Sequence, residues 1–281
     1  MPIPTVKLSN GVLMPAIGIG SSGEFGGYGH EATVYAIQDC GMRLVDTAAI
    51  YGTEKNVGKA INESGIPRQD FFITTKLWFT DMGYESGKKA LQASLKALNL
   101  EYVDLYLIHM PNCPDGTTNP TKTRQDTWRV LHEAYEQGIC KSIGVSNYDV
   151  RHLEELQTMQ VVPHVNQIEY HPFQDPNRDV IKYCKANNIV LQAYSPFCAG
   201  KAVSHPEIIK VAQKNKRTQG QVILRWIIQH GIVPVPKTAK VERAKENSTI
   251  FDFQLSKEDM DAMDNIHKDS FHTLNPFKDV P

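Results

Sequence analysis

Short apolar runs alternate with longer amphipathic segments along almost the whole chain. Eight of the runs are rich in Val, Ile and Leu and show little polar alternation, which is typical of parallel strands buried on both faces. These runs predict eight strands, at residues 16–20, 43–47, 71–77, 103–109, 142–146, 165–169, 190–195 and 233–237.

The segments between these runs predict helices, because their apolar positions recur at helical spacing. Gly41 and Gly138 follow two of them at the position where glycine usually ends a helix. Ser256, with Asp259 three residues later, indicates the start of a last helix. We expect helices at residues 30–40, 55–63, 86–98, 125–137, 150–158, 179–186, 206–216, 218–229 and 256–266.

A β-hairpin is expected before the first of these units. Residues 5–8 and 12–14 flank Ser9-Asn10-Gly11, and Asn-Gly is a strong two-residue turn signal because both residues accept positive φ. The β-then-α units that follow are joined without a linker or a change in composition. The sequence therefore predicts one domain over residues 1–281, an α/β fold of the (β/α)₈ TIM-barrel type with an N-terminal hairpin and extra helices.

A doubly wound dinucleotide-binding fold is the main alternative. Residues 18–23 match the G-x-G-x-x-G pattern of that fold, which functions only where a helix N-terminus follows at once. Residues 24–29 have the composition of a loop instead. We therefore interpret residues 18–23 as a glycine-rich loop and favour the closed barrel.

Composition narrows the class of protein further. The chain has 281 residues, 41% hydrophobic and 22% charged, with a net charge of −1, so nothing favours a nucleic-acid or membrane partner. The N-terminus has no apolar signal segment, which together with unpaired cysteines favours a reducing, cytoplasmic location, and we expect a monomer without metal. The five cysteines are scattered and form no C-x-x-C pair: Cys40, Cys113, Cys140, Cys184 and Cys198.

Polar residues stand where three successive strands end. Asp46, Lys76 and His109 end the second, third and fourth predicted strands, and Tyr51 lies in the loop after Asp46. The active sites of such barrels lie at this edge. A neighbouring ammonium would make the Tyr51 phenol more acidic, and a carboxylate would keep Lys76 charged. Each residue alone would be an ion pair or a packing group, but together they indicate acid–base chemistry on a carbonyl.

The chain resembles the aldo-keto reductase family, and the matching segments follow in the same order along nearly the whole chain. The segments that carry it are RLVDTAAIYGTEKNVGKAI (43–61), ITTKLW (73–78), LEYVDLYLIHMP (100–111), GVSN (144–147), VNQIEYHP (165–172), AYSP (193–196) and VPVPKTAKVERAKENSTIFDFQL (233–255). The chain is most similar to the short microbial and protist members, which include aldehyde reductases and prostaglandin F synthases.

The resemblance implies roles for particular residues. It makes Asp46, Tyr51, Lys76 and His109 a catalytic tetrad in which Tyr51 is the general acid. It implies NADPH/NADP⁺ as the cofactor, with polar groups on the nicotinamide carboxamide, an aromatic ring stacked on the nicotinamide and a cationic clamp on the 2′-phosphate. The cofactor residues it assigns are Ser146, Asn147, Gln167, Tyr194, Ser195, Lys237, Thr238, Arg243, Glu246 and Asn247.

NADPH is favoured over NADH by the cationic residues near the end of the chain. Lys237 and Arg243 would form charge-assisted bonds to a 2′-phosphate, and Glu246 and Asn247 would meet the adenine. A carboxylate at the 2′ position would have favoured NAD instead. A surface basic pair on a helix is the alternative interpretation.

The substrate pocket departs from the pattern common in the family. Trp78 is retained, but Ser21-Ser22 replaces a Thr-Trp pair and Met110 replaces a Trp after His109. We also expect the specificity loop after residue 266 to be abbreviated. A wider pocket follows, which favours broad acceptance of aldehydes and ketones, glyoxals and quinones included. A prostaglandin F synthase-type reductase of prostaglandin or quinone substrates is the alternative within this chemistry.

Two other functions remain open. One is a barrel hydrolase or isomerase that uses Asp46 and His109 without a nicotinamide. The other is a nicotinamide-sensing binding subunit like the β-subunits of potassium channels, which share the fold and tetrad but carry an N-terminal extension.

Overall fold

Eight parallel strands form a ring in the computed structural model, which describes residues 2–23 and 27–266. Each strand pairs with the next in sequence, and all the pairs are parallel. The strands are β3 Gly18–Gly20, β4 Leu44–Asp46, β5 Phe72–Leu77, β6 Leu105–Ile108, β7 Ile143–Ser146, β8 Val165–Glu169, β9 Val190–Tyr194 and β10 Val233–Pro234.

The first and last strands meet, which closes the ring. The amide of Gly20 donates to the carbonyl of Pro236 at 3.0 Å, and Gly20 forms a parallel bridge with Lys237. The assigned part of β10 is short because Pro234 and Pro236 have no N–H to donate. The predicted (β/α)₈ barrel is therefore confirmed.

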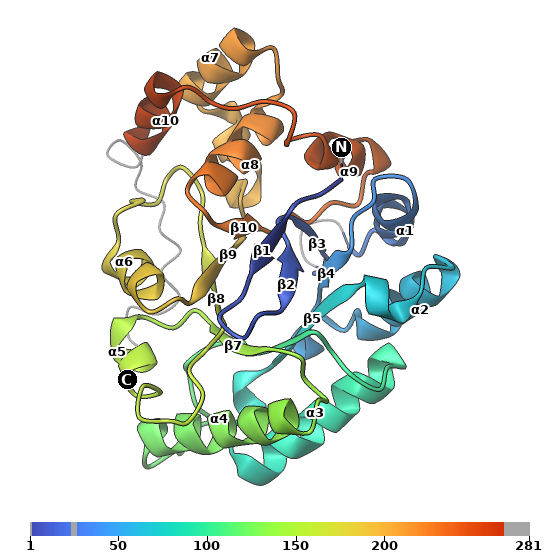
Figure 1. Cartoon of the computed structure of the whole chain (residues 1–281), viewed down its shortest axis with the longest axis vertical. Coiled ribbons are helices and arrows are strands. Elements are labelled where there is room, and N and C mark those ends of the chain that lie inside the picture. Colours follow the sequence, from blue (N-terminus) through green and yellow to red (C-terminus); the bar gives the residue numbers. More distant parts are fainter. Residues whose placement is uncertain (1, 24–26, 267–281) are drawn as a thin grey trace.

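Helices surround this ring (Figure 1). The α-helices are α1 His30–Gln38, α2 Glu54–Glu63, α3 Tyr84–Leu98, α4 Pro120–Glu136, α5 Val150–Glu154, α6 Asp179–Ala186, α7 Pro206–Asn215, α8 Gln219–Gln229, α9 Val241–Ser248 and α10 Lys257–Asp264. Short 3₁₀ turns lie at η1 Ala49–Tyr51, η2 Arg68–Asp70, η3 Phe79–Asp81, η4 Cys198–Gly200 and η5 Ala202–Ser204.

The predicted hairpin lies across one end of the barrel (Figure 1). It consists of β1 Thr5–Lys7 and β2 Leu13–Pro15, which pair antiparallel. Its buried residues Leu8 and Met14 join an apolar cluster inside the barrel. That cluster includes the first residues of five strands: Leu44, Phe72, Leu105, Val165 and Val233. The hairpin thus covers the N-terminal end of the barrel and leaves the C-terminal end for a site.

The structure differs from the sequence prediction in three main ways. The helix expected at 150–158 ends at Glu154, after which i→i+3 bonds such as Gln157 N–H to Glu154 C=O continue the chain as tighter turns. Helix α9 was not predicted, because its sequence is polar and only Ala244 and Asn247 are buried. The 3₁₀ turns were also not predicted, because single turns carry no periodicity.

The glycine pattern at 18–23 serves the barrel wall. Gly18 and Gly20 form strand β3, and α1 begins only at His30. A Cβ on Gly18 would lie 2.2 Å from Leu44 Cδ2, and one on Gly20 would lie 3.2 Å from the Val235 carbonyl. These close contacts explain the glycines by packing between strands. Residues 24–26 of the expected loop, and the expected short segment after 266, lie outside the described residues.

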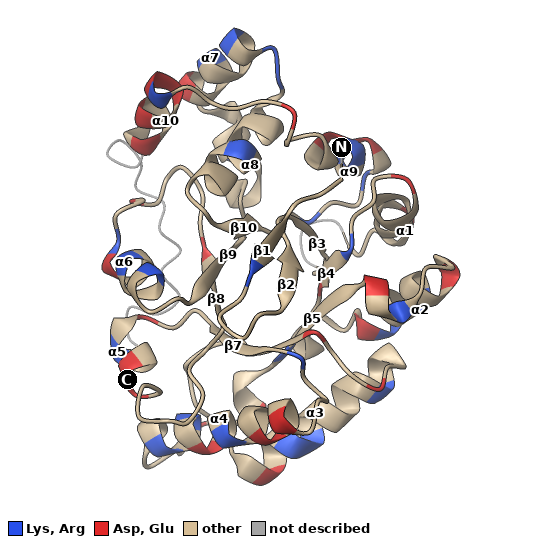
Figure 2. Cartoon of the chain, viewed as in Figure 1, with Lys and Arg blue, Asp and Glu red and all other residues tan. Residues whose placement is uncertain are grey.

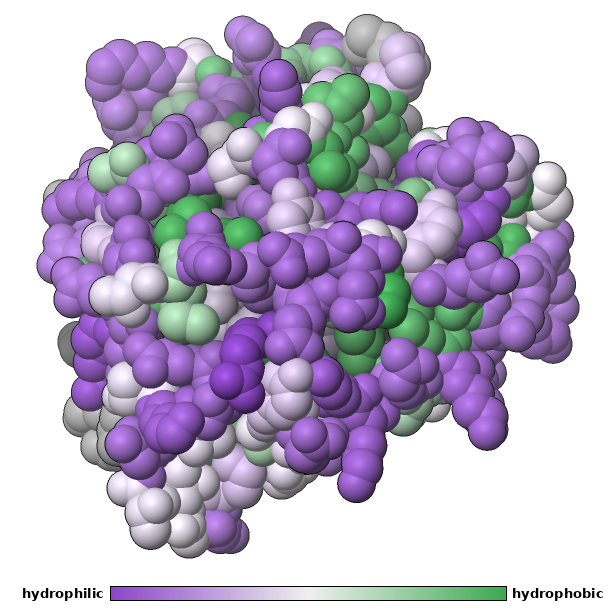
Figure 3. Space-filling view, turned by 60° about the horizontal axis from the view of Figure 1, so that its bottom comes forward, coloured by the Kyte–Doolittle hydropathy of each residue, from purple (hydrophilic) through white to green (hydrophobic). Residues whose placement is uncertain are grey.

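Charged residues lie mostly on the outer helices, with both signs interspersed (Figure 2). The face shown in Figure 3 is largely hydrophilic, with separate smaller hydrophobic areas. Within residues 2–23 and 27–266, no helix is both long and apolar enough to cross a membrane. The same residues contain no cluster of three or more metal-ligand side chains.

Candidate active site

Three neighbouring strands bring the predicted acid–base residues together at the C-terminal end of the barrel. Asp46 is the last residue of β4, Lys76 lies one residue before the end of β5, and His109 follows β6 directly. Tyr51 ends the 3₁₀ turn η1 that follows β4. The predicted group of four residues therefore forms one site, because parallel strands end at the same edge.

A buried ion pair lies at the base of this site. Lys76 Nζ is 2.6 Å from Asp46 Oδ1 and also donates to the Thr47 carbonyl at 3.0 Å. Lys76 is 0% exposed. Burial lowers the pKa of Lys76, and the Asp46 carboxylate opposes that effect. Removing one partner of such a pair typically costs about 3–5 kcal/mol because the other charge stays buried.

Tyr51 and His109 meet above this pair. The Tyr51 hydroxyl lies 3.4 Å from His109 Nε2, and the Lys76 ammonium lies 5.0 Å from the centre of the Tyr51 ring. Burial lowers the pKa of His109 to about 2, and the charge of Lys76 acts in the same direction. His109 is therefore a neutral imidazole that can donate one hydrogen bond and accept another.

The segment that carries Tyr51 is fixed at both of its ends. The hydroxyls of Thr47 and Thr53 lie 3.1 Å apart and close the loop at its base, and Ser21 contacts Thr53 at the same distance. Glu54, the first residue of α2, accepts a hydrogen bond of 2.6 Å from the buried Thr75 hydroxyl. These bonds tie the Tyr51 corner to the strand that carries Lys76.

A set of amide and hydroxyl groups extends the site across β7 and β8. The Ser146 hydroxyl donates to the Gln167 carbonyl at 2.8 Å, and Asn147 Nδ2 donates to the His109 carbonyl at 3.0 Å. Gln167 Nε2 donates to Asp46 Oδ2 at 2.8 Å. Asn147 has a φ of 64°, a left-handed conformation that Asn tolerates better than most residues. Asn147 and Gln167 thus contact tetrad residues directly, and Ser146 contacts Asn147 and Gln167.

The aromatic residue predicted to stack on a nicotinamide lies beside this set. Tyr194 ends β9, and its hydroxyl donates to Asn147 Oδ1 at 2.8 Å. Tyr194 as a whole is only partly buried. Ser195 follows with a φ of 49° and is exposed.

The residues predicted for the phosphate end lie around the start of α9. Lys237 forms the bridge that closes the barrel, and the Thr238 hydroxyl accepts the backbone N–H of Lys240, the residue before α9. Burial lowers the pKa of Lys237. Arg243 is exposed on the first turns of α9, where a helix N-terminus also favours an anion. Glu246 and Asn247 follow later on the same helix.

Two of the predicted pocket residues flank His109. The Trp78 ring meets the His109 ring edge-on with centroids 5.1 Å apart, and partly exposed Met110 follows His109. Phe79, which sequence reasoning did not single out, adds a second ring 4.8 Å from Trp78. Ser21 is buried behind Thr53, so it supports the Tyr51 corner.

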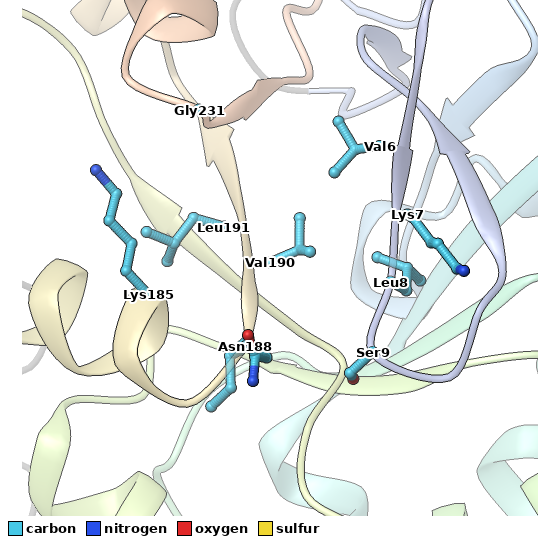
Figure 4. A pocket seen from close by; sticks show the side chains of 10 residues that line it. Val6, Lys7, Leu8, Ser9, Lys185, Asn188, Val190, Leu191 and Gly231 are labelled. Atoms are coloured by element: carbon cyan, nitrogen blue, oxygen red, sulfur yellow. The ribbon is translucent and has the colours of Figure 1, made fainter.

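A separate hollow of about 430 Å³ lies at the opposite end of the barrel (Figure 4). It is formed by residues 6–9 of the hairpin and residues 188–191 at the start of β9. Val6, Val190 and Leu191 surround its centre in Figure 4. It lies at the N-terminal ends of the strands and therefore does not belong to the site of Tyr51.

Sequence reasoning missed several polar residues that support the site. Thr47, Thr53 and Glu54 hold the Tyr51 corner, and Gln192 accepts a hydrogen bond from Gln167 at 2.9 Å. Gln192 carried a signal, because it is a polar residue in the middle of an apolar strand run. The pattern did not say which partner it would meet.

Comparisons with known proteins define the class to which this barrel belongs. The profile of the Aldo/keto reductase family matches residues 28–268. The chain therefore belongs to the aldo/keto reductase family and is an oxidoreductase, as its resemblance implied.

Individual relatives cover almost the whole chain. It is 44% identical to "Glyoxal reductase" of Bacillus subtilis, over 97% of this chain and 96% of that protein. It is 40% identical to "9,11-endoperoxide prostaglandin H2 reductase" of Trypanosoma cruzi, over 94% and 92%. A solved Bombyx mori aldo-keto reductase in complex with NADP is 30% identical with a TM-score of 0.88, over 100% of this chain and 98% of that one.

Proposed function

We propose that this protein reduces aldehydes and ketones to alcohols with NADPH, and that Tyr51 donates the proton to the carbonyl oxygen. The observation that carries the proposal is the meeting of the Tyr51 hydroxyl and His109 Nε2, 3.4 Å apart, above the buried Lys76–Asp46 pair. A carbonyl oxygen placed between these two groups would receive hydrogen bonds from both.

The protonation states fit this division of labour. His109 stays neutral because burial lowers its pKa to about 2, so it orients the oxygen as a hydrogen-bond donor and does not supply the proton. The Lys76 ammonium, 5.0 Å from the Tyr51 ring centre, stabilises the negative charge that the phenol gains as it gives up its proton. Asp46 holds Lys76 in place.

The residues at the barrel mouth fit a nicotinamide cofactor. Ser146, Asn147 and Gln167 offer buried hydroxyl and amide groups, and Tyr194 offers a partly exposed ring. Within the described part of the chain, Gln167 Oε1 has no hydrogen-bond partner, so it can accept one from a carboxamide. When bound there, NADPH supplies the hydride for the carbonyl carbon. Lys237, Thr238 and Arg243 would hold its 2′-phosphate.

The test of this proposal is Tyr51→Phe. Loss of a general acid typically lowers turnover about 10²–10⁴-fold. We expect that loss in kcat with methylglyoxal, while the Kd for NADPH, measured by quenching of tryptophan fluorescence, stays within about twofold because the phenyl ring remains. Tyr183→Phe, on the outer helix α6, is the matched control and keeps wild-type turnover. A Tyr51→Phe protein with most of its turnover would show that another group donates the proton.

The choice of cofactor has its own test. Arg243→Ala should raise the Kd for NADPH about tenfold and leave the Kd for NADH unchanged, because only NADPH carries the 2′-phosphate. Arg217→Ala is the control, since that residue pairs with Asp252. Equal losses for NADPH and NADH would contradict the assignment of Arg243.

Small dicarbonyls are the substrate class we favour, glyoxal and methylglyoxal among them. The 44% identity to a glyoxal reductase supports this choice, as does the flexible Met110 beside His109, which adapts to varied shapes. Steady-state kcat/KM over a panel of dicarbonyls, aromatic aldehydes, quinones and prostaglandin H2 would test it. A higher kcat/KM for prostaglandin H2 or quinones would favour the alternative suggested by the Trypanosoma cruzi relative.

A further inference from the structure

A line of hydrogen bonds runs through the barrel interior from the site to the hairpin. Gln167 Nε2 donates to Asp46 Oδ2 at 2.8 Å and to Gln192 Oε1 at 2.9 Å. Gln192 Nε2 in turn faces Met14 Sδ at 3.1 Å. Gln192 and Met14 are 0% exposed, so water does not compete for these groups. The line joins β4, β8 and β9 to the hairpin strand β2.

The direction of each bond in this line is fixed by chemistry. The Asp46 carboxylate only accepts hydrogen bonds, so the amide nitrogen of Gln167 must face it. Gln167 and Gln192 are register partners on adjacent strands, which places their side chains on the same face of the sheet. If Gln192 presented its nitrogen, two N–H groups would face each other. The thioether of Met14 is a weak acceptor for that nitrogen instead.

We propose that Gln192 is a positioning residue for cofactor binding: it fixes the plane of the Gln167 amide and thereby aims Gln167 Oε1 at the carboxamide NH₂ of NADPH. This inference rests on the proposed function. Asp46 alone holds one N–H of Gln167 and leaves the amide free to rotate about that bond. Gln192 holds the second N–H, so a planar amide with both donors engaged has one orientation.

The test compares two nucleotides that differ only in the group Gln167 Oε1 would meet. NADPH carries a carboxamide, and reduced 3-acetylpyridine adenine dinucleotide phosphate carries a methyl in place of the NH₂. We expect the wild-type protein to bind NADPH about tenfold more tightly, because the analogue leaves Oε1 unpaired. Fluorescence quenching gives both Kd values and needs no turnover.

Two substitutions of Gln192 should affect the preference for NADPH over the analogue in different ways. Gln192→Met keeps the approximate volume but removes the acceptor, so the preference for NADPH should fall about three- to tenfold. Gln192→Glu keeps an oxygen toward Gln167. Because the position is fully buried, we expect the new carboxyl to stay protonated, so that a hydroxyl replaces the nitrogen that faces Met14 and the preference is retained. Thermal unfolding shows whether each variant is folded, and the ratio of the two Kd values cancels a general loss of affinity.

The outcomes separate this inference from the proposed function. Wild-type protein that binds neither nucleotide would overturn the proposed function and this inference with it. Wild-type protein that binds both equally, or a Gln192→Met protein that keeps the full preference, would overturn the role of Gln192 alone. Equal loss of preference in Gln192→Glu and Gln192→Met would also overturn it, because the retained oxygen would then not matter.

Discussion

The histidine beside Tyr51 is neutral because it is buried next to a cation. Burial, with the charge of Lys76 added, lowers the pKa of His109 to about 2. In the reduction direction, kcat/KM should therefore show no inflection near pH 6.5, since His109 takes up a proton only at far lower pH. A pH profile from 5 to 8 measures this directly.

A substitution at His109 provides the control for that profile. His109→Gln keeps a neutral donor and should lower the rate without changing the shape of the pH profile over this range. An acidic limb near pH 6–7 that disappears in His109→Gln would show instead that the imidazole titrates during the reaction.

A single residue, Met110, should also control the width of the substrate pocket, because it directly follows His109. Met110→Trp should narrow the pocket beside Trp78. We expect kcat/KM for bulky aromatic ketones to fall about tenfold, since steric discrimination of this kind is typically worth one to two powers of ten. The value for methylglyoxal should change less than about threefold. Equal losses for both substrates would place Met110 away from the bulky part of the substrate.

At the scale of elements, each predicted strand exists within a few residues of its expected bounds. Strands such as residues 71–77 are predictable because a parallel strand buried on both faces is a continuous apolar run bounded by polar loops. Once the strands are predicted, the residues at their C-terminal ends are predicted too. Asp46, Lys76 and His109 could therefore be identified from the sequence alone.

Contacts between distant polar residues could not be predicted in the same way. Glu54 follows a glycine-containing turn and looks like a solvated first-turn acid, yet it is buried against Thr75, 21 positions away. Gln192 meets Met14 across 178 positions of sequence. A local sequence pattern does not say which strands will be neighbours. The hydrogen-bond partners of Glu54 and Gln192 are therefore visible only in the folded barrel.

Two glycines inside helices differ in how closely the neighbouring elements pack against them. A Cβ on Gly58 of α2 would lie 2.2 Å from the Leu98 carbonyl at the end of α3. A Cβ on Gly87 of α3 would meet Leu77 Cδ1 at 3.4 Å, an ordinary contact. Gly58 therefore allows α2 and α3 to approach closely, whereas the position of Gly87 has room for a methyl group.

The two alanine substitutions should therefore differ in sign. Gly58→Ala should lower the free energy of unfolding by about 1–3 kcal/mol through overpacking. Gly87→Ala should raise it by up to about 1 kcal/mol, because alanine favours a helix interior and space exists for its methyl group. Urea unfolding measures both. A destabilised Gly87→Ala would mean that α3 lies closer to the barrel than the structure shows.

For the whole molecule, buried histidines link stability to pH. Burial lowers the pKa of His152 to about 4 and that of His109 to about 2, and it also lowers the pKa of His164. In the unfolded chain each titrates near 6.5. Below that pH the unfolded chain binds more protons than the folded one, so stability is complete above pH 6.5 and falls as the solution becomes more acidic.

The slope of this loss can be measured. Each fully buried neutral histidine contributes up to about 1.4 kcal/mol per pH unit below 6.5, so His109 and His152 together predict a loss of about 2–3 kcal/mol between pH 6 and 5. His152→Gln should reduce that slope by about 1.4 kcal/mol per unit, whatever it costs at pH 7.5, because one proton fewer is taken up on unfolding. Urea unfolding of both proteins across pH 5–7.5 gives the two slopes. Identical slopes would mean that His152 is already protonated in the folded barrel, and the acid sensitivity would then have to arise elsewhere.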